Sequence, residues 1–147
     1  MRVAHGFDLH PGAGWHVAAH RQTPEFAGQA SNLVVHASTV ALRRDDGDFG
    51  SGVAERLGAN DLFCSFFEYD AASAGAALFA ARGLPRPRPS DFLVGAQQRP
   101  MPGQSAAQYF FTEASRAWCL FVVLGSHSRR QSGAVRVSAL LKGVHIS

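Results

Sequence analysis

The stretch from Trp118 to Leu124 reads Trp-Cys-Leu-Phe-Val-Val-Leu, with an apolar side chain at every position. Successive side chains of a β-strand point to opposite faces of the sheet, so a strand of this composition is apolar on both faces. The stretch Asp61–Glu68, Asp-Leu-Phe-Cys-Ser-Phe-Phe-Glu, also carries apolar side chains on both faces. Both strands have to be covered from two sides, which argues against a simple two-layer sandwich.

Alternating apolar residues predict further strands along the chain. These strands are, in chain order, Val3–Leu9, Trp15–Ala19, Leu33–Leu42, Phe92–Gln98 and Ala106–Thr112. The first two flank the turn residues Pro11 to Gly14, and the last is joined to the strand at 117–124 by Glu113 to Arg116. Both arrangements are hairpin signals.

Helices are predicted in two places. Ala71–Arg82 is rich in alanine, which favours helix. From Ser126 to Lys142 the apolar residues fall near one stripe of a helix, with Ser126 or Ser128 as a candidate N-cap. With the strands, these elements predict an α+β fold: a mainly antiparallel sheet covered by helices on both faces, which is a three-layer α/β/α sandwich.

The length of 147 residues is that of one domain, so residues 1–147 are predicted to form a single domain. Its expected core is built mainly on aromatic rings from the strands, with two leucines of the last helix packed onto the sheet. The predicted core residues are Phe7, Trp15, Phe63, Phe66, Phe67, Phe111, Trp118, Leu120, Val122, Leu140 and Leu141.

Each end of the chain carries a short motif. The opening reads Phe7-x-Leu9-x-Pro11-x-x-Gly14-Trp15, and the ending reads Val137-x-x-Leu140-Leu141-x-x-Val144-x-Ile146. The first resembles the opening hairpin, with a slightly different spacing between Pro11 and Gly14, and the second resembles the closing helix of the PsbP/Mog-like α/β/α sandwich superfamily, and of uncharacterised actinobacterial proteins of that type in particular. The resemblance implies a mostly non-enzymatic binding role. It carries over no binding residue, because these motifs are structural.

Composition excludes several classes of protein. Hydrophobic residues make up 46% and charged residues 17% of the sequence, which is incompatible with disorder. No apolar stretch approaches the ~20 residues that a membrane span needs. The net charge of +3 is spread along the chain, so no specific nucleic-acid binding is expected. The first residues lack a signal peptide, so the expected location is the cytoplasm if Met1 is the natural start, and the cell envelope if an anchor precedes it.

Metal and cofactor sites are not predicted. His5, His10, His16 and His20 lie on the opening hairpin, but strand alternation sends His5 and His16 to opposite faces, so the four do not converge on an ion. The stretch 45–48, Asp-Asp-Gly-Asp, lacks the ligand spacing of a calcium loop and indicates a turn. Cys64 and Cys119 lie within apolar strands and are expected to be buried free thiols.

Two arginine clusters are candidate binding residues. Arg129 and Arg130, near the start of the last helix, are a candidate anion site because free backbone N–H groups lie beside them. The proline-stiffened strap that follows Leu84 is a candidate recognition surface with outward-facing guanidinium groups. Its residues are Arg86, Arg88, Phe92 and Arg99.

The sequence therefore predicts a non-enzymatic binding domain for a protein partner or an apolar ligand. One alternative is a small hydrolase or isomerase that uses Ser126 and His127, or His127 with Glu113, although these residues lack the spacing of a nucleophile elbow. Another alternative is a structural component of a larger envelope or secretion assembly. The sequence leaves open whether the chain forms a homo-oligomer.

Overall fold

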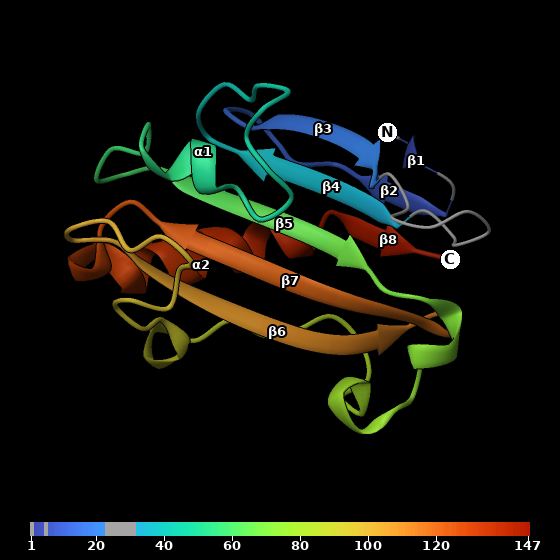
Figure 1. The fold of residues 1–147 in the computed structure, drawn as a ribbon. Helices are drawn as coiled ribbons and strands as arrows, with labels where there is room; N and C mark the ends of the chain where they lie inside the picture. Colours follow the sequence, from blue (N-terminus) through green and yellow to red (C-terminus); the bar gives the residue numbers. More distant parts are fainter. Residues whose placement is uncertain (1, 5, 23–31) are drawn as a thin grey trace.

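A five-stranded antiparallel sheet forms the centre of the computed structural model, which describes residues 2–4, 6–22 and 32–147 (Figure 1). Its strand order is β3-β4-β5-β7-β6. The strands are β3 (His16–Arg21), β4 (Leu33–Ser38), β5 (Leu62–Glu68), β7 (Arg116–Leu124) and β6 (Ser105–Glu113). The two doubly apolar stretches become the neighbouring strands β5 and β7, which lie inside the sheet as expected.

A second, three-stranded sheet has the order β1-β2-β8. It contains β1 (Arg2–Ala4), β2 (Phe7–Leu9) and β8 (Val144–Ile146), so the two ends of the chain pair with each other. The predicted opening hairpin is therefore wrong, because β2 pairs with β1 and β8 while β3 pairs with β4. The turn residues after Leu9 carry the chain from one sheet to the other.

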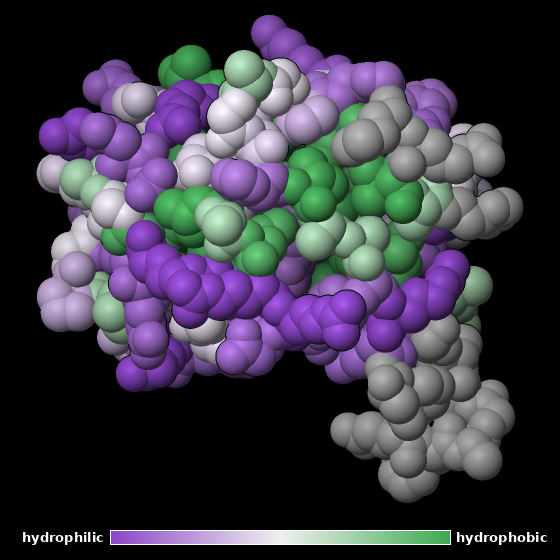
Figure 2. Space-filling model, turned by 90° about the horizontal axis from the view of Figure 1, so that it is seen from above, coloured by the Kyte–Doolittle hydropathy of each residue, from purple (hydrophilic) through white to green (hydrophobic). Residues whose placement is uncertain are grey.

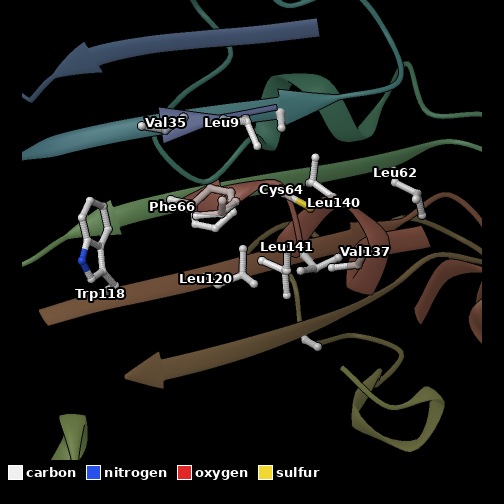
Figure 3. Packing of buried hydrophobic residues seen from close by; sticks show 14 of the residues in the cluster. Leu9, Val35, Leu62, Cys64, Phe66, Trp118, Leu120, Val137, Leu140 and Leu141 are labelled. Carbon is white, nitrogen blue, oxygen red and sulfur yellow. The ribbon is translucent and has the colours of Figure 1, made fainter. Parts of the chain in front are cut away.

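One face of the central sheet is covered by this small sheet and by α2 (Arg130–Leu141) (Figure 1). The apolar side of α2 packs onto the strands, and Figure 3 shows Val137, Leu140 and Leu141 lying against Leu120 and Cys64. The helical stripe predicted from the sequence is thus confirmed. Neither Ser126 nor Ser128 caps α2, because Arg129 is at the N-cap position and no side chain makes a capping hydrogen bond.

The opposite face is covered by irregular chain. The segment 39–60, with the single turn α1 (Ser51–Ala54), packs Val53 and Leu57 against Phe63 and Phe121. A second cluster, around Val34, Phe67 and Cys119, is covered by Phe49, Tyr69 and Phe110. The expected three-layer α/β/α sandwich with helices on both faces is therefore wrong: α2 is a real helix on one face, and loops cover the other.

The alanine-rich stretch 71–82 explains much of that error. It forms two separate 3-10 turns, Ala71–Ser73 and Ala77–Phe79, with Gly75 between them at φ 77°. Phe79 is buried against Tyr69 and Phe110, so tertiary packing of one ring overrides the helix preference of alanine. Two further 3-10 turns, Pro89–Asp91 and His127–Arg129, lie nearer the C-terminus.

The predicted strand at 92–98 is also wrong. Leu93 forms one isolated bridge to Ala106, and the chain then turns at Gly95, where φ is 83°. The two neighbouring apolar residues, Leu93 and Val94, are exposed.

The predicted core is confirmed at ten of its eleven positions, with Trp15 only half-buried. Both cysteines are buried and free, as expected. They lie on opposite faces of the sheet, because Cys64 is opposite Val122 on β7, an odd number of residues from Cys119. Burial raises the pKa of Cys64 to about 12 and that of Cys119 to about 11. Within the described part of the chain, no helix is long and apolar enough to cross a bilayer.

Candidate functional site

A pocket of about 490 Å³ lies beside the edge strand β3 and under the segment that connects β4 to α1. It combines small apolar residues with two histidines, two arginines and one carboxylate. The lining residues are Ala18, Ala19, His20, His36, Leu42, Arg43, Arg44, Gly47 and Asp48. Its volume falls within the range of about 300–1,000 Å³ that is typical of small-molecule sites.

The register of β3 and β4 brings the two histidines together. Ala18 is opposite His36, and His20 is opposite Val34, so His20 and His36 are diagonal neighbours on one face of the sheet. Their rings are 5.5 Å apart and nearly perpendicular. His36 also packs edge-on against Phe63 at 5.0 Å, which fixes its ring beneath the pocket.

Asp48 joins the loop to both histidines. Its carboxylate accepts hydrogen bonds from His20 Nε2 and Gln22 Nε2, each at 3.0 Å. Its backbone carbonyl accepts hydrogen bonds from His36 Nε2 at 2.9 Å and from Ser65 Oγ at 2.6 Å. Asp48 therefore connects β3, β4 and β5. The residue before it, Gly47, has a φ of 80°, a left-handed conformation that favours glycine.

A buried ion pair holds the rest of the loop. Both carboxylate oxygens of Asp46 accept hydrogen bonds from the Arg56 guanidinium, at 2.8 and 3.0 Å, and one also accepts from Arg43 N at 2.6 Å. Burial alone would raise the pKa of Asp46, but these hydrogen bonds outweigh it and the pKa is lowered. The ionised pair fixes the backbone that presents Arg43 and Arg44.

The charges that line the pocket favour an anion. Arg43 and Arg44 are exposed at its rim. The one lining carboxylate, Asp48, is already hydrogen-bonded to His20 and Gln22. Burial lowers the pKa of His36, and the opposing hydrogen bond to the Asp48 carbonyl does not compensate fully, so this ring is neutral at pH 7. The pocket thus combines two exposed guanidinium groups with apolar side chains, two histidine rings and one carboxylate.

The four residues of the candidate recognition surface differ in their exposure and contacts. Arg86 and Arg88 are exposed and alternate with half-buried prolines, as predicted. Phe92 is buried and cannot contact a partner, and Arg99 forms an exposed ion pair with Glu55. Asp91 stiffens the strap by accepting hydrogen bonds from Arg88 N at 2.9 Å and from Tyr109 Oη at 2.8 Å.

The two arginines of the candidate anion site at the start of α2 have different hydrogen-bond partners. Arg129 donates a hydrogen bond to Asn60 Oδ1, whereas Arg130 bonds back to the carbonyl of His127 at 3.1 Å. Arg136, about two helical turns further along the chain, shares Asn60 with Arg129. The open depression around Asn60 includes Arg129 and Arg136 but not Arg130.

The residues of the alternative hydrolase site do not form a catalytic group. Ser126 Oγ hydrogen-bonds to Ser128 Oγ at 2.8 Å. His127 Nδ1 is buried with no hydrogen-bond partner among the described residues. Glu113 lies at the far end of the β6–β7 hairpin, opposite Arg116, while Ser126 follows the other end of β7.

The sequence predictions missed the pocket, although they had considered some of its residues. His20 was considered only as a metal ligand, the stretch 45–48 was interpreted as a turn, and His36 was not singled out within its predicted strand. Even spacing along β4 places His36 on the same face as Val34, but only the register with β3 shows that His20 shares this face. His5 lies outside the described residues, and the described residues contain no group of three or more potential ligands that could hold a metal ion.

Comparison with family models, with curated proteins and with solved structures returns no match for this chain.

Proposed function

We propose that this chain is a non-enzymatic binding domain whose ligand places an anionic group in the pocket between β3 and the segment 42–48. The observation that carries the proposal is the lining itself: the exposed Arg43 and Arg44, the apolar Ala18 and Leu42, and Asp48 hydrogen-bonded to His20. Guanidinium groups suit carboxylates and phosphates because they donate paired hydrogen bonds in a plane.

The pocket supports binding more than covalent catalysis. None of its described lining residues carries a hydroxyl or thiol group that could act as a nucleophile. The loop is also fixed from below by the Asp46–Arg56 pair, so little ordering cost accompanies ligand entry. The resemblance to PsbP/Mog-like proteins stays a prediction, and this proposal does not rest on it, because the opening hairpin and the α/β/α sandwich that it implies are wrong.

The test uses hexanoate, which combines a carboxylate with a short apolar chain, and hexylammonium, which has the same chain and the opposite charge. We expect isothermal titration to show binding of hexanoate and none of hexylammonium. Replacing Arg43 and Arg44 together by alanine should weaken hexanoate binding roughly tenfold, as expected for the loss of charged hydrogen bonds.

The matched control is the double variant Arg86→Ala/Arg88→Ala, which also removes two exposed arginines. It should bind hexanoate as the parent protein does. Equal binding of the two probes, or loss of binding in the Arg86/Arg88 variant alone, would contradict the proposed site and favour the strap instead.

A further inference from the structure

The strand beside the pocket ends the central sheet. β3 has β4 on one side and is the last strand of the five. In an antiparallel pair, alternate residues direct their N–H and C=O groups toward the neighbour and the residues between them direct theirs outward. Within the described part of the chain, the backbone of residues 16–20 hydrogen-bonds to β4 alone. Its outward groups are therefore available to another strand.

β3 carries few of the features that usually block edge pairing. Natural edge strands are protected by proline, by charged side chains or by bulges. β3 contains no proline, its arginine is the last of its six residues, and the strand pairs with β4 in continuous register without a bulge. Ala18 and Ala19 in the middle are exposed and small, so a second backbone can approach closely. Figure 2, which views the molecule from the side of β3, shows an apolar band bordered by hydrophilic residues.

The pocket and the edge are continuous, because Ala18 and Ala19 also line the pocket. A chain lying along β3 would pass its mouth. The rim offers the exposed guanidinium groups of Arg43 and Arg44, while the Asp48 carboxylate is engaged by His20 and Gln22 and the Asp46 carboxylate is paired with Arg56. Although Asp45 and Asp48 offset part of this positive charge, Arg43 and Arg44 are the exposed groups beside the strand that can pair with acidic side chains.

We infer that the partner of this site is an extended acidic peptide segment that pairs with β3 as an added strand and places a Glu or Asp side chain in the pocket. This inference rests on the proposed function. Main-chain hydrogen bonds supply affinity in this mode of recognition, and a pocket for alternate side chains supplies specificity.

The probe is a fluorescein-labelled peptide, Thr-Val-Glu-Val-Glu-Val, whose two glutamates lie on one face when it is extended. Fluorescence anisotropy should show binding to the full chain. A peptide of the same sequence with N-methyl groups on alternate residues cannot donate backbone hydrogen bonds from one edge, so it should bind roughly tenfold more weakly. Replacing both glutamates of the peptide by lysine should weaken its binding at least as much.

Two proline variants test the strand itself. Adjacent residues direct their N–H groups in opposite directions, so one of Ala18→Pro and Ala19→Pro removes an outward group while the other removes a bond to β4. The variant that keeps the parent melting temperature should lose the peptide. Because Ala18 and Ala19 also line the pocket, hexanoate binding is compared on the unmodified protein, where the N-methylated peptide tests strand pairing alone.

The outcomes separate the two proposals. Hexanoate binding together with equal binding of the plain and N-methylated peptides would overturn strand addition and leave the pocket function in place. Sedimentation could also show a dimer that is lost in the proline variant with the parent melting temperature. That result would mean that a second copy occupies the edge of β3, and it would overturn the peptide proposal. Absence of binding by both hexanoate and peptide would remove the pocket function as well.

Discussion

His36 is the residue in the pocket whose ionisation the fold most opposes. It is 5% exposed, and burial lowers its pKa from about 6.5. The groups facing it are His20, which disfavours its charge, and Asp48 and Asp46, which favour it. Because the unfolded chain binds this proton more readily than the folded one, the His36 contribution lowers stability as the pH falls below about 6.5.

The prediction is tested by urea unfolding of the parent protein and of His36→Gln, which keeps a donor for the Asp48 carbonyl. Between pH 7 and pH 5 the parent should lose more free energy of unfolding than the variant. Asp46 affects stability in a separate pH range. Because its pKa is lowered in the folded protein, its ionised form stabilises the fold, and this stabilisation is lost only as the pH falls below about 4. Identical pH profiles for the two proteins would show that His36 is not the titrating group.

Arg56 is predicted to be the most important arginine for stability. Its partner Asp46 is 2% exposed, so removing the guanidinium leaves a buried, uncompensated carboxylate. Arg56→Ala should lower the free energy of unfolding by about 3 kcal/mol. The control is Arg99→Ala, whose ion pair with Glu55 is 66% and 47% exposed and should contribute less than about 1 kcal/mol. Similar losses in the two variants would refute a special role for Asp46.

At the scale of elements, α2 offers a test of one-sided burial. Val137 is 0% exposed against the sheet, and Val135, two residues earlier in the same helix, is 67% exposed. Val137→Ala should therefore lower the free energy of unfolding by about 2 kcal/mol, through lost packing and a small cavity. Val135→Ala should change it by less than about 0.5 kcal/mol. Comparable effects in chemical denaturation would mean that α2 does not pack as described.

The turn between β6 and β7 is strained. Ala114 and Ser115 have φ of 53° and 60°, the conformation of a two-residue hairpin turn that favours Asn-Gly. The double variant Ala114→Asn/Ser115→Gly should therefore raise the free energy of unfolding by about 1 kcal/mol. Ala139→Gly, on the exposed side of α2, is the control and should lower it by about 1 kcal/mol. A destabilised turn variant would count against the assigned backbone.

The elements that could be predicted are those whose packing is encoded locally. β5, β7 and α2 carry apolar patterns that match their burial, and the β6–β7 hairpin has its turn in the sequence between them. The predictions for 71–82 and 92–98 were wrong because the structure of these stretches depends on distant partners, Phe79 on Tyr69 and Leu93 on Ala106. Helix preference and alternation carry no information about such contacts.

At the scale of the whole molecule, the pairing of the chain ends and the pocket could not be predicted for a related reason. The opening residues favour a local hairpin, yet β2 pairs with β8 at the other end of the chain. The pocket likewise needs His20, His36 and Asp48 from three segments, and no spacing in the sequence specifies the β3–β4 register that joins them. The exposed arginines of the strap could be predicted because exposure of charged residues needs no long-range information.

In the proposed function, the space between β3 and the segment 42–48 receives an anionic group. Titration of the ¹⁵N-labelled protein with hexanoate, followed by two-dimensional NMR, locates the bound probe residue by residue. We predict that the largest shifts fall on the amides of Ala18, Ala19 and Gly47 and on the ring of His20. Shifts centred on Asn60 and Arg129, or no saturable shift anywhere, would contradict the account.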